Sequence, residues 1–133
     1  MANDFWDGEE PESISPHKAV DSDAEEFFNA GVFLLKRNKP KEALVAFWRA
    51  YSIRETDPRY MSYLGLCIAL AENRLADGCL LCEKAVKKDF YRAELFLNLG
   101  KVYVMMNNRR KAHLALRKGL SLDQENRQIR QEL

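Results

Sequence analysis

The chain has 133 residues, 21 Lys and Arg against 20 Asp and Glu, and a hydrophobic fraction of 47%. This length suits one domain with a single core, and the composition is that of an ordinary globular protein. The longest apolar run, residues 64–71, is far shorter than the ~18 residues that a membrane span requires. The acidic N-terminus lacks the basic and apolar regions of a signal peptide. Three cysteines, an odd number, do not suggest a disulfide framework. We therefore expect a cytoplasmic protein that does not enter a membrane.

Residues 1–23 differ in composition from the rest of the chain. They carry seven acidic residues against Lys18 alone and show no apolar periodicity, which predicts a disordered acidic tail. Residues 24–133 carry twenty Lys and Arg against thirteen Asp and Glu, so the body is basic. Phe5 and Trp6 are unusual within such a tail. They suggest either a short docking motif or a segment that folds back into the protein's own binding groove.

A pattern of small and large residues recurs three times along the chain. Gly31, Gly65 and Gly100 are 34 and 35 residues apart, and each follows a large residue by four positions. A small-x-x-x-large-x-x-small pattern then begins twelve or thirteen residues later, with Phe47, Cys82 and Leu116 as its large members. Because small residues let helices approach closely, we expect each glycine to lie where two helices cross, opposite one of these large residues.

Helix start and stop signals divide each repeat into two antiparallel helices. Asp57-Pro58 is typical of an N-cap followed by proline at the first helical position. Ser22 and Glu25 have the spacing of a capping box that would open the first helix. Asn38, Asn73 and Asn107 follow the first helix of each repeat, where the chain needs a left-handed residue. The middle repeat has one extra residue near residues 71–73, which should lengthen its first helix or its loop.

These patterns closely resemble the tetratricopeptide repeat (TPR). The resemblance covers residues 24–126 and implies an all-α, right-handed solenoid of three antiparallel helix pairs. We expect repeats at about residues 24–57, 58–92 and 93–126, after a disordered acidic tail at residues 1–23. Residues 127–133 are expected to begin a C-terminal capping helix.

The first helix of each repeat carries a second apolar stripe, which predicts a groove for a partner. A surface helix normally has only one apolar stripe, and first helices line the concave side of such stacks. We expect the groove to hold an apolar or amphipathic peptide or helix of another protein. Leu70 and Met105 flank it. The predicted groove residues are Phe28, Val32, Leu35, Lys36, Arg59, Ser62, Leu66, Ala69, Glu94, Leu97, Lys101 and Val104.

The resemblance also bears on the choice of partner. The best-known charged groove of the family clamps a C-terminal carboxylate, and the matching positions here are largely Phe28, Val32, Tyr63, Glu94 and Asn98. The clamp residues are absent, so binding of chaperone tails is not expected. Alternatively, the apolar stripe only packs neighbouring repeats together, or the acidic tail covers it.

Two other functions remain open at this stage. Residues 57–73 resemble the middle repeat of the three-TPR chaperones that hold translocator segments in bacterial type III secretion. The stripe also suits a self-association domain, with a homodimer as its product and Trp48 as a candidate contact.

Catalysis and cofactor binding find no support in the sequence. Cys79 and Cys82 have C-x-x-C spacing but are predicted to lie within a helix among leucines, where packing is the better interpretation. Cys67 and His113 do not complete a zinc site. No nucleophile is paired with a base, and no glycine-rich phosphate loop occurs. We predict a non-enzymatic protein without cofactor or metal. Its basic clusters, residues 36–41 and 109–118, are expected to be solvated helix faces rather than a nucleic-acid site.

Overall fold

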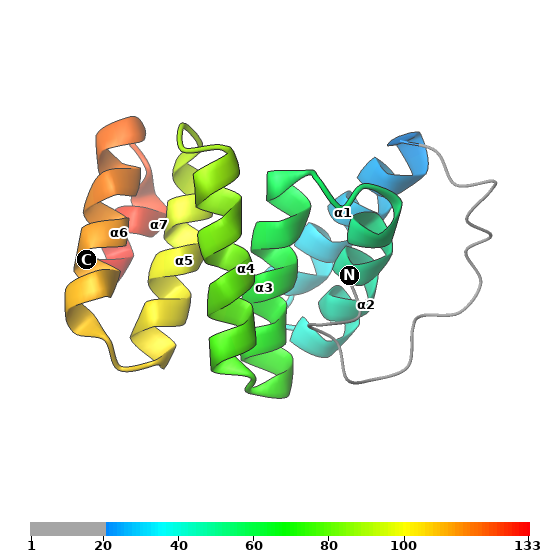
Figure 1. Cartoon of the computed structure of the whole chain (residues 1–133), viewed down its shortest axis with the longest axis horizontal. Helices are drawn as coiled ribbons and strands as arrows, with labels where there is room; N and C mark the ends of the chain where they lie inside the picture. The colour runs from blue at the N-terminus through cyan, green and yellow to red at the C-terminus, as the bar shows by residue number, and fades with distance from the viewer. Residues whose placement is uncertain (1–20) are drawn as a thin grey trace.

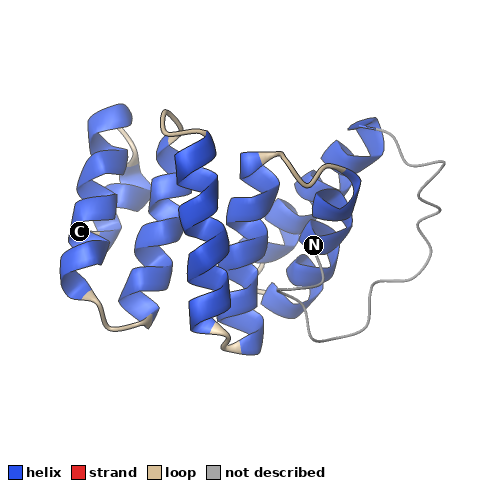
Figure 2. Cartoon of the chain, viewed as in Figure 1, coloured by secondary structure: helices blue, strands red, loops and turns tan. Residues whose placement is uncertain are grey.

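The computed structural model describes residues 21–133, which form helices and, within that range, no strand (Figure 2). Three antiparallel pairs, α1/α2, α3/α4 and α5/α6, stack side by side, and α7 packs against α5 and α6 at one end of the stack (Figure 1). The predicted all-α solenoid is confirmed. The helices are α1 (Asp21–Lys36), α2 (Pro40–Ile53), α3 (Pro58–Glu72), α4 (Leu75–Lys88), α5 (Ala93–Met105), α6 (Arg109–Leu122) and α7 (Arg127–Glu132).

The first helix begins earlier than the sequence predicts. Residues 1–20 of the predicted tail, including Phe5 and Trp6, lie outside the described residues, but residues 21–23 belong to α1. Asp21 and Asp23 lie in its first turn, where negative charge favours the positive end of the helix dipole. Ser22 is therefore inside the helix, and the predicted capping box with Glu25 is wrong.

The other predicted helix ends are confirmed. Asn38, Asn73 and Asn107 are the only non-glycine residues between 21 and 133 with positive φ, at 61°, 54° and 58°. Behind Asn38, the Lys39 N–H donates to the Leu34 carbonyl over 3.0 Å, which closes the end of α1. Pro40 and Pro58 each stand in the first turn of a helix. The Asp57 carboxylate caps α3 by accepting from the Arg59 N–H over 2.9 Å.

The extra residue of the middle repeat is absorbed at the end of α3. This helix continues to Glu72, whereas α1 and α5 end closer to their glycines, at Lys36 and Met105. The Arg74 N–H reaches back to the Ile68 carbonyl over 3.4 Å, so the last turn is wider than the corresponding turns of α1 and α5. The insertion thus lengthens the helix and leaves the stacking of the pairs intact.

The glycines lie at the helix crossings, as predicted. A methyl group added to Gly31 would lie 2.5 Å from Phe47 Cε1, and one added to Gly100 would lie 2.6 Å from Leu116 Cδ2. At Gly65 the same atom would lie 2.6 Å from the Gly78 carbonyl oxygen and 3.0 Å from Cys82 Sγ. Because no side chain fits in these gaps, the two helices of each pair can approach closely.

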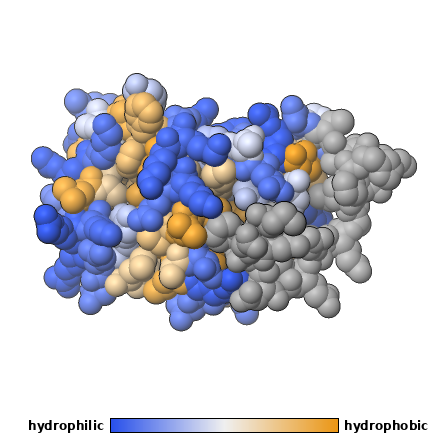
Figure 3. Space-filling model, in the orientation of Figure 1, coloured by the Kyte–Doolittle hydropathy of each residue, from blue (hydrophilic) through white to orange (hydrophobic). Residues whose placement is uncertain are grey.

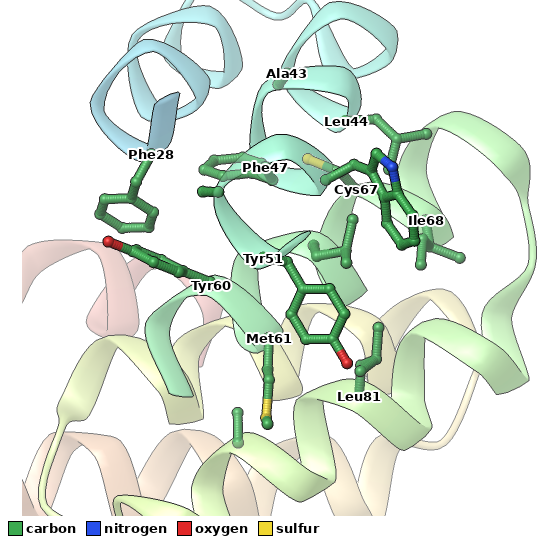
Figure 4. Close-up of a cluster of buried hydrophobic side chains, with 14 of the residues drawn as sticks. Phe28, Ala43, Leu44, Phe47, Tyr51, Tyr60, Met61, Cys67, Ile68 and Leu81 are labelled. Carbon is green, nitrogen blue, oxygen red and sulfur yellow. The ribbon is translucent and has the colours of Figure 1, made fainter. Parts of the chain in front are cut away.

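The largest part of the core lies between the first two pairs. Phe28, Phe47 and Tyr60 come together there, with Leu44 beside Ile68 a little further along (Figure 4). Trp48 belongs to the same cluster and is only 3% exposed, so it packs helix pairs together and the suggestion that it contacts a second chain is wrong. Within residues 21–133, every helix is too short or too polar to span a bilayer.

Candidate functional site: the shared face of α1, α3 and α5

The predicted groove residues lie on three neighbouring helices that run in the same direction. Equivalent positions of α1, α3 and α5 form rows across these helices, and we call the surface made by the rows the A-helix face. From the N-terminal to the C-terminal ends of the helices, the rows are Glu25, Arg59 and Glu94; Phe28, Ser62 and Leu97; Val32, Leu66 and Lys101; Leu35, Ala69 and Val104; and Lys36, Leu70 and Met105.

The second row is filled by the chain's own side chains. Phe28 is 7% exposed, and its ring centroid lies 5.2 Å from that of Tyr60 and 5.3 Å from that of Tyr63. Leu97 is 3% exposed and clusters with Ile129 of α7, while Ser62 is fully buried. A partner cannot reach these three side chains while the solenoid is folded.

The first row is occupied by ion pairs and hydrogen bonds within the chain. Arg59 donates two hydrogen bonds to Glu25, of 3.0 and 2.8 Å, and a third of 3.2 Å to Asp57. The hydroxyl of Tyr60 also donates to Glu25 over 2.8 Å. The bonds from Arg59 lower the pKa of the Glu25 carboxyl, and the bond from Tyr60 adds to this effect. The two carboxylates in turn raise the pKa of Arg59. Arg59 is therefore a structural cation that holds α1 against α3.

A second polar cluster joins α3 to α5. The Tyr63 hydroxyl donates to Glu94 over 2.8 Å, and burial together with the Glu94 charge raises the pKa of this tyrosine. Beneath it, the Asn98 amide donates to the Ser62 hydroxyl over 3.0 Å, and Asn98 is only 2% exposed. The N-terminal half of the A-helix face is thus closed by satisfied polar groups.

The middle of the face is also buried. Leu66 and Ala69 are each 1% exposed and belong to a core cluster with Leu99 and Val102. The prediction of an accessible apolar groove is therefore wrong at five buried positions: Phe28, Ser62, Leu66, Ala69 and Leu97. Adjacent parallel helices approach closely enough for these side chains to fill the space between them.

The C-terminal half of the face remains accessible. Val104 is 50% exposed and Leu70 is 44% exposed. Val32, Leu35 and Met105 are half-buried against the core clusters. We call this surface the C-terminal ledge; its residues are Val32, Leu35, Lys36, Leu70, Lys101, Val104 and Met105.

Two of the ledge residues were placed only at the edge of the predicted groove. Leu70 and Met105 occupy the position after Ala69 and Val104 in their helices. Both residues are apolar at the position where α1 has Lys36. This difference was the sequence signal that could have identified them as site residues. Lys36 is exposed and Lys101 half-buried, so the ledge combines apolar side chains with positive charge.

The cysteines are packed in the interior rather than poised for redox chemistry. Cys67, Cys79 and Cys82 are all buried and unpaired. Burial raises the pKa of Cys67 to about 12 and that of Cys79 to about 11, and it raises the pKa of Cys82 further. The packing interpretation of the C-x-x-C spacing is confirmed. Residues 21–133 contain no group of three His, Cys, Asp or Glu side chains placed to hold a metal ion.

The sequence matches no protein-family model and no curated protein. The structure, in contrast, is similar to many solved structures. YrrB, described as a TPR protein with an unusual peptide-binding site, has 27% sequence identity to the chain and a TM-score of 0.66. The alignment covers 82% of this chain but only 56% of YrrB. The first TPR domain of human RPAP3 has 16% identity and a TM-score of 0.72, with 86% of this chain and 89% of that one covered.

A bacterial neighbour belongs to one of the functional classes left open by the sequence. The Yersinia enterocolitica type III secretion translocator chaperone SycD has 14% identity and a TM-score of 0.65, covering 85% of this chain and 84% of SycD. At this identity the likeness concerns the fold alone. The helix pairs, the glycine crossings and these neighbours together show that the chain has the fold of the tetratricopeptide repeat proteins.

Proposed function

We propose that the chain is a non-catalytic interaction module that binds an apolar or amphipathic segment of another protein on the C-terminal ledge. The observation that carries this proposal is the exposure of Val104 and Leu70, 50% and 44%, in neighbouring rows of the face. Exposed apolar side chains that gather on one surface are typical of interaction sites. TPR neighbours in complex with peptides, such as RPAP3 with the HSP90 peptide SRMEEVD, lend support to a protein ligand.

The ledge favours a particular chemistry in its partner. Leu70, Val104 and Met105 would contact apolar anchors spaced as on one face of a helix. Lys36 and Lys101 stand beside these positions and would attract acidic groups at the edge of the segment. We therefore infer an amphipathic segment with acidic flanks. The lysines would mainly speed association, and the apolar contacts would supply most of the affinity.

Peptides that end in EEVD are not the proposed ligands of this chain. Such a peptide needs cationic and amide side chains free to bind its terminal carboxylate. Here Glu94 would repel that carboxylate, and Asn98 is buried with its amide bonded to Ser62. The N-terminal half of the A-helix face is thus occupied by internal pairs, which leaves the C-terminal ledge as the favoured site.

Two alternatives keep some support. The first is a chaperone that holds an apolar translocator segment, the class to which the neighbour SycD belongs, and the ledge would serve that role as well. Self-association through the ledge is the second alternative. The molar mass of the purified chain at several concentrations tests the latter, because a stable dimer that disappears in Val104→Glu would place the self-interface on the ledge.

The ledge proposal is tested by placing a photo-crosslinking amino acid at position 104 and capturing partners in cells that express the chain. The matched control carries the same group at Leu80 of α4, which is 43% exposed and lies off the A-helix face. We expect a discrete product from position 104 that is absent from position 80.

The same experiment is then repeated with a charge in the ledge. Leu70→Glu should abolish the crosslink from position 104, and Leu80→Glu should leave it unchanged. Circular dichroism verifies that both variants keep their helical content. Equal yields in the two variants, or equal products from both crosslinking positions, would refute the ledge as the binding site.

A further inference from the structure

The second helix of each pair carries a stripe of residues against which the next pair packs. On α2 this stripe is Leu44, Trp48 and Tyr51, which are 2%, 3% and 6% exposed. They share a core cluster with Ile68 of α3 (Figure 4). The outward stripe of α2 is therefore sealed completely by the following helix pair.

The equivalent stripe of α4 is covered less completely, and its residues are more polar: Cys79 is buried, whereas Glu83 and Val86 are half-buried. Cys79, Glu83 and Val86 occupy the positions that correspond to Leu44, Trp48 and Tyr51. Tyr103 of α5 packs in a cluster with Cys79 and donates its hydroxyl to Glu83. A large side chain from the following helix therefore packs on the stripe in both cases, Ile68 on α2 and Tyr103 on α4.

On α6 the corresponding place is largely open. The equivalent residues are His113, Arg117 and Leu120, of which the first two are exposed. The short helix α7 covers part of the C-terminal half of α6, where Ile129 contacts Gly119 and clusters with Leu116 and Leu120. A depression of about 320 Å³ remains, and its lining residues are Arg117, Leu120, Ser121, Gln124 and Arg130. Figure 3 shows mostly hydrophilic residues around small apolar patches at this end of the molecule.

The charge of α6 points to an acidic occupant. The helix RRKAHLALRKGLSL contains five Lys and Arg and no acidic residue. Three of these cations stand in its first turn, where they oppose the helix dipole. Among the described residues, no carboxylate forms an ion pair with any of them. The terminal face of a helix stack needs only mixed positive and negative charges to keep the protein soluble. Helix α6 instead carries positive charge alone.

We propose that the outer face of α6 binds residues 4–12 of the same chain, the stretch DFWDGEEPE. This stretch combines five acidic residues with the neighbouring aromatic residues Phe5 and Trp6. An aromatic side chain enters the depression and packs on Leu120, whose equivalent on α4 is Val86. The flanking carboxylates pair with Arg117 and Arg130. This contact lies on a different surface from the C-terminal ledge and goes beyond the proposed function.

The geometry permits this contact within one molecule. The start of α1 and the end of α6 both lie at the upper edge of the stack in Figure 1. Helix axes pack 8–10 Å apart, so three helix pairs separate the two points by roughly 30 Å. Residues 7–20 span at most roughly 50 Å when extended. An attached segment also acts at an effective concentration near the millimolar range.

The proposal is tested on the full chain by paramagnetic relaxation in NMR. A nitroxide is attached to Asn3→Cys, which leaves every charge in place. The native cysteines are buried, and the wild-type chain treated with the same reagent controls for their labelling. We expect the amide signals of residues 109–122 to lose intensity, and those of the C-terminal ledge to keep it. Loss at the ledge instead, or at neither site, would overturn the proposal.

Charge-reversed variants and a mixed sample complete the test. Arg117→Glu with Arg130→Glu should reduce the relaxation at α6 by about fivefold, as expected if roughly 1 kcal/mol of pairing is lost. Lys41→Glu with Lys87→Glu makes the same charge change elsewhere and should have little effect. Equal loss in both double variants would overturn the role of the α6 cations. If a spin-labelled second copy broadens the NMR signals of an isotope-labelled chain, the contact forms between two molecules. That result would overturn the assignment to the same molecule.

Discussion

Glu25 of α1 and Arg59 of α3 form a paired contact of two hydrogen bonds, 3.0 and 2.8 Å long, across the first two helix pairs. The guanidinium also lies over the Phe28 ring, 5.0 Å from its centroid. This contact covers a residue that would otherwise line the groove. It thus fixes the spacing of α1 and α3 and closes the N-terminal half of the A-helix face.

The Glu25–Arg59 pair makes the stability of the fold depend on pH. Because the bonds from Arg59 lower the pKa of Glu25 below its ordinary 4.5, the folded chain favours the charged carboxylate. This contribution is present above the unfolded pKa and is lost as the pH falls through the lowered one. We expect Glu25→Gln to reduce the unfolding free energy near pH 7 by at most about 1 kcal/mol, since the pair is partly exposed.

Urea denaturation between pH 7 and pH 3 measures this effect. The difference in unfolding free energy between wild type and Glu25→Gln should decrease below about pH 4.5, the ordinary pKa of the glutamate carboxyl. Glu26→Gln, on the exposed side of α1, is the matched control. If this difference in unfolding free energy stays constant down to pH 3, the charge of the Glu25 carboxylate contributes nothing to stability.

The crossing of α5 and α6 depends on the absence of a side chain at position 100. Gly100→Ala improves helix propensity by about 1 kcal/mol. However, its methyl group would lie 2.6 Å from Leu116 Cδ2, so we expect a net loss of about 1–3 kcal/mol in unfolding free energy. Gly100→Leu should cost more, by a few kcal/mol, because the helices must separate.

A double-mutant cycle separates overpacking from other causes. Leu116→Ala alone leaves a cavity and should cost about 2–5 kcal/mol. In the combination of Gly100→Ala and Leu116→Ala the added methyl group enters that cavity, so the double variant should be more stable than the sum of the single effects predicts. Thermal or urea unfolding of the four chains gives the coupling, and strict additivity would contradict the crossing mechanism.

The features that were predictable from the sequence are those set by a few residues at a fixed spacing. The crossings need small residues, and the turns need a residue that tolerates positive φ, so Gly100 and Asn107 identify them directly. Exposure on the A-helix face could not be predicted in the same way. A helical periodicity gives the direction of Leu66 or Leu97 but not the distance to the neighbouring helix. The covering of Leu97 by Ile129 also depends on a short helix whose position the repeats do not determine.

The buried cysteines should be unreactive in the folded chain. A thiol reacts as its thiolate, and burial raises the pKa of Cys79, the most exposed of the three at 7%, to about 11. At pH 8 we expect an aromatic disulfide reagent to modify none of the three native thiols within minutes and all three in urea. Rapid reaction of one thiol in the native protein would restore a redox interpretation of Cys79 and Cys82.

The Ser62–Asn98 bond tests whether buried polarity stabilises the contact between α3 and α5. Asn98→Leu keeps a similar volume but removes the donor to the Ser62 hydroxyl, which is fully buried. We expect a loss of about 1–3 kcal/mol from the unsatisfied group. Ser62→Ala should also destabilise, since the Asn98 amide then loses its bond to the Ser62 hydroxyl. Adding Ser62→Ala to Asn98→Leu should recover part of the loss, because an apolar pair leaves no buried polar atom without a partner. If the double variant is as unstable as the sum of the two single variants, the loss comes from packing rather than from the broken bond.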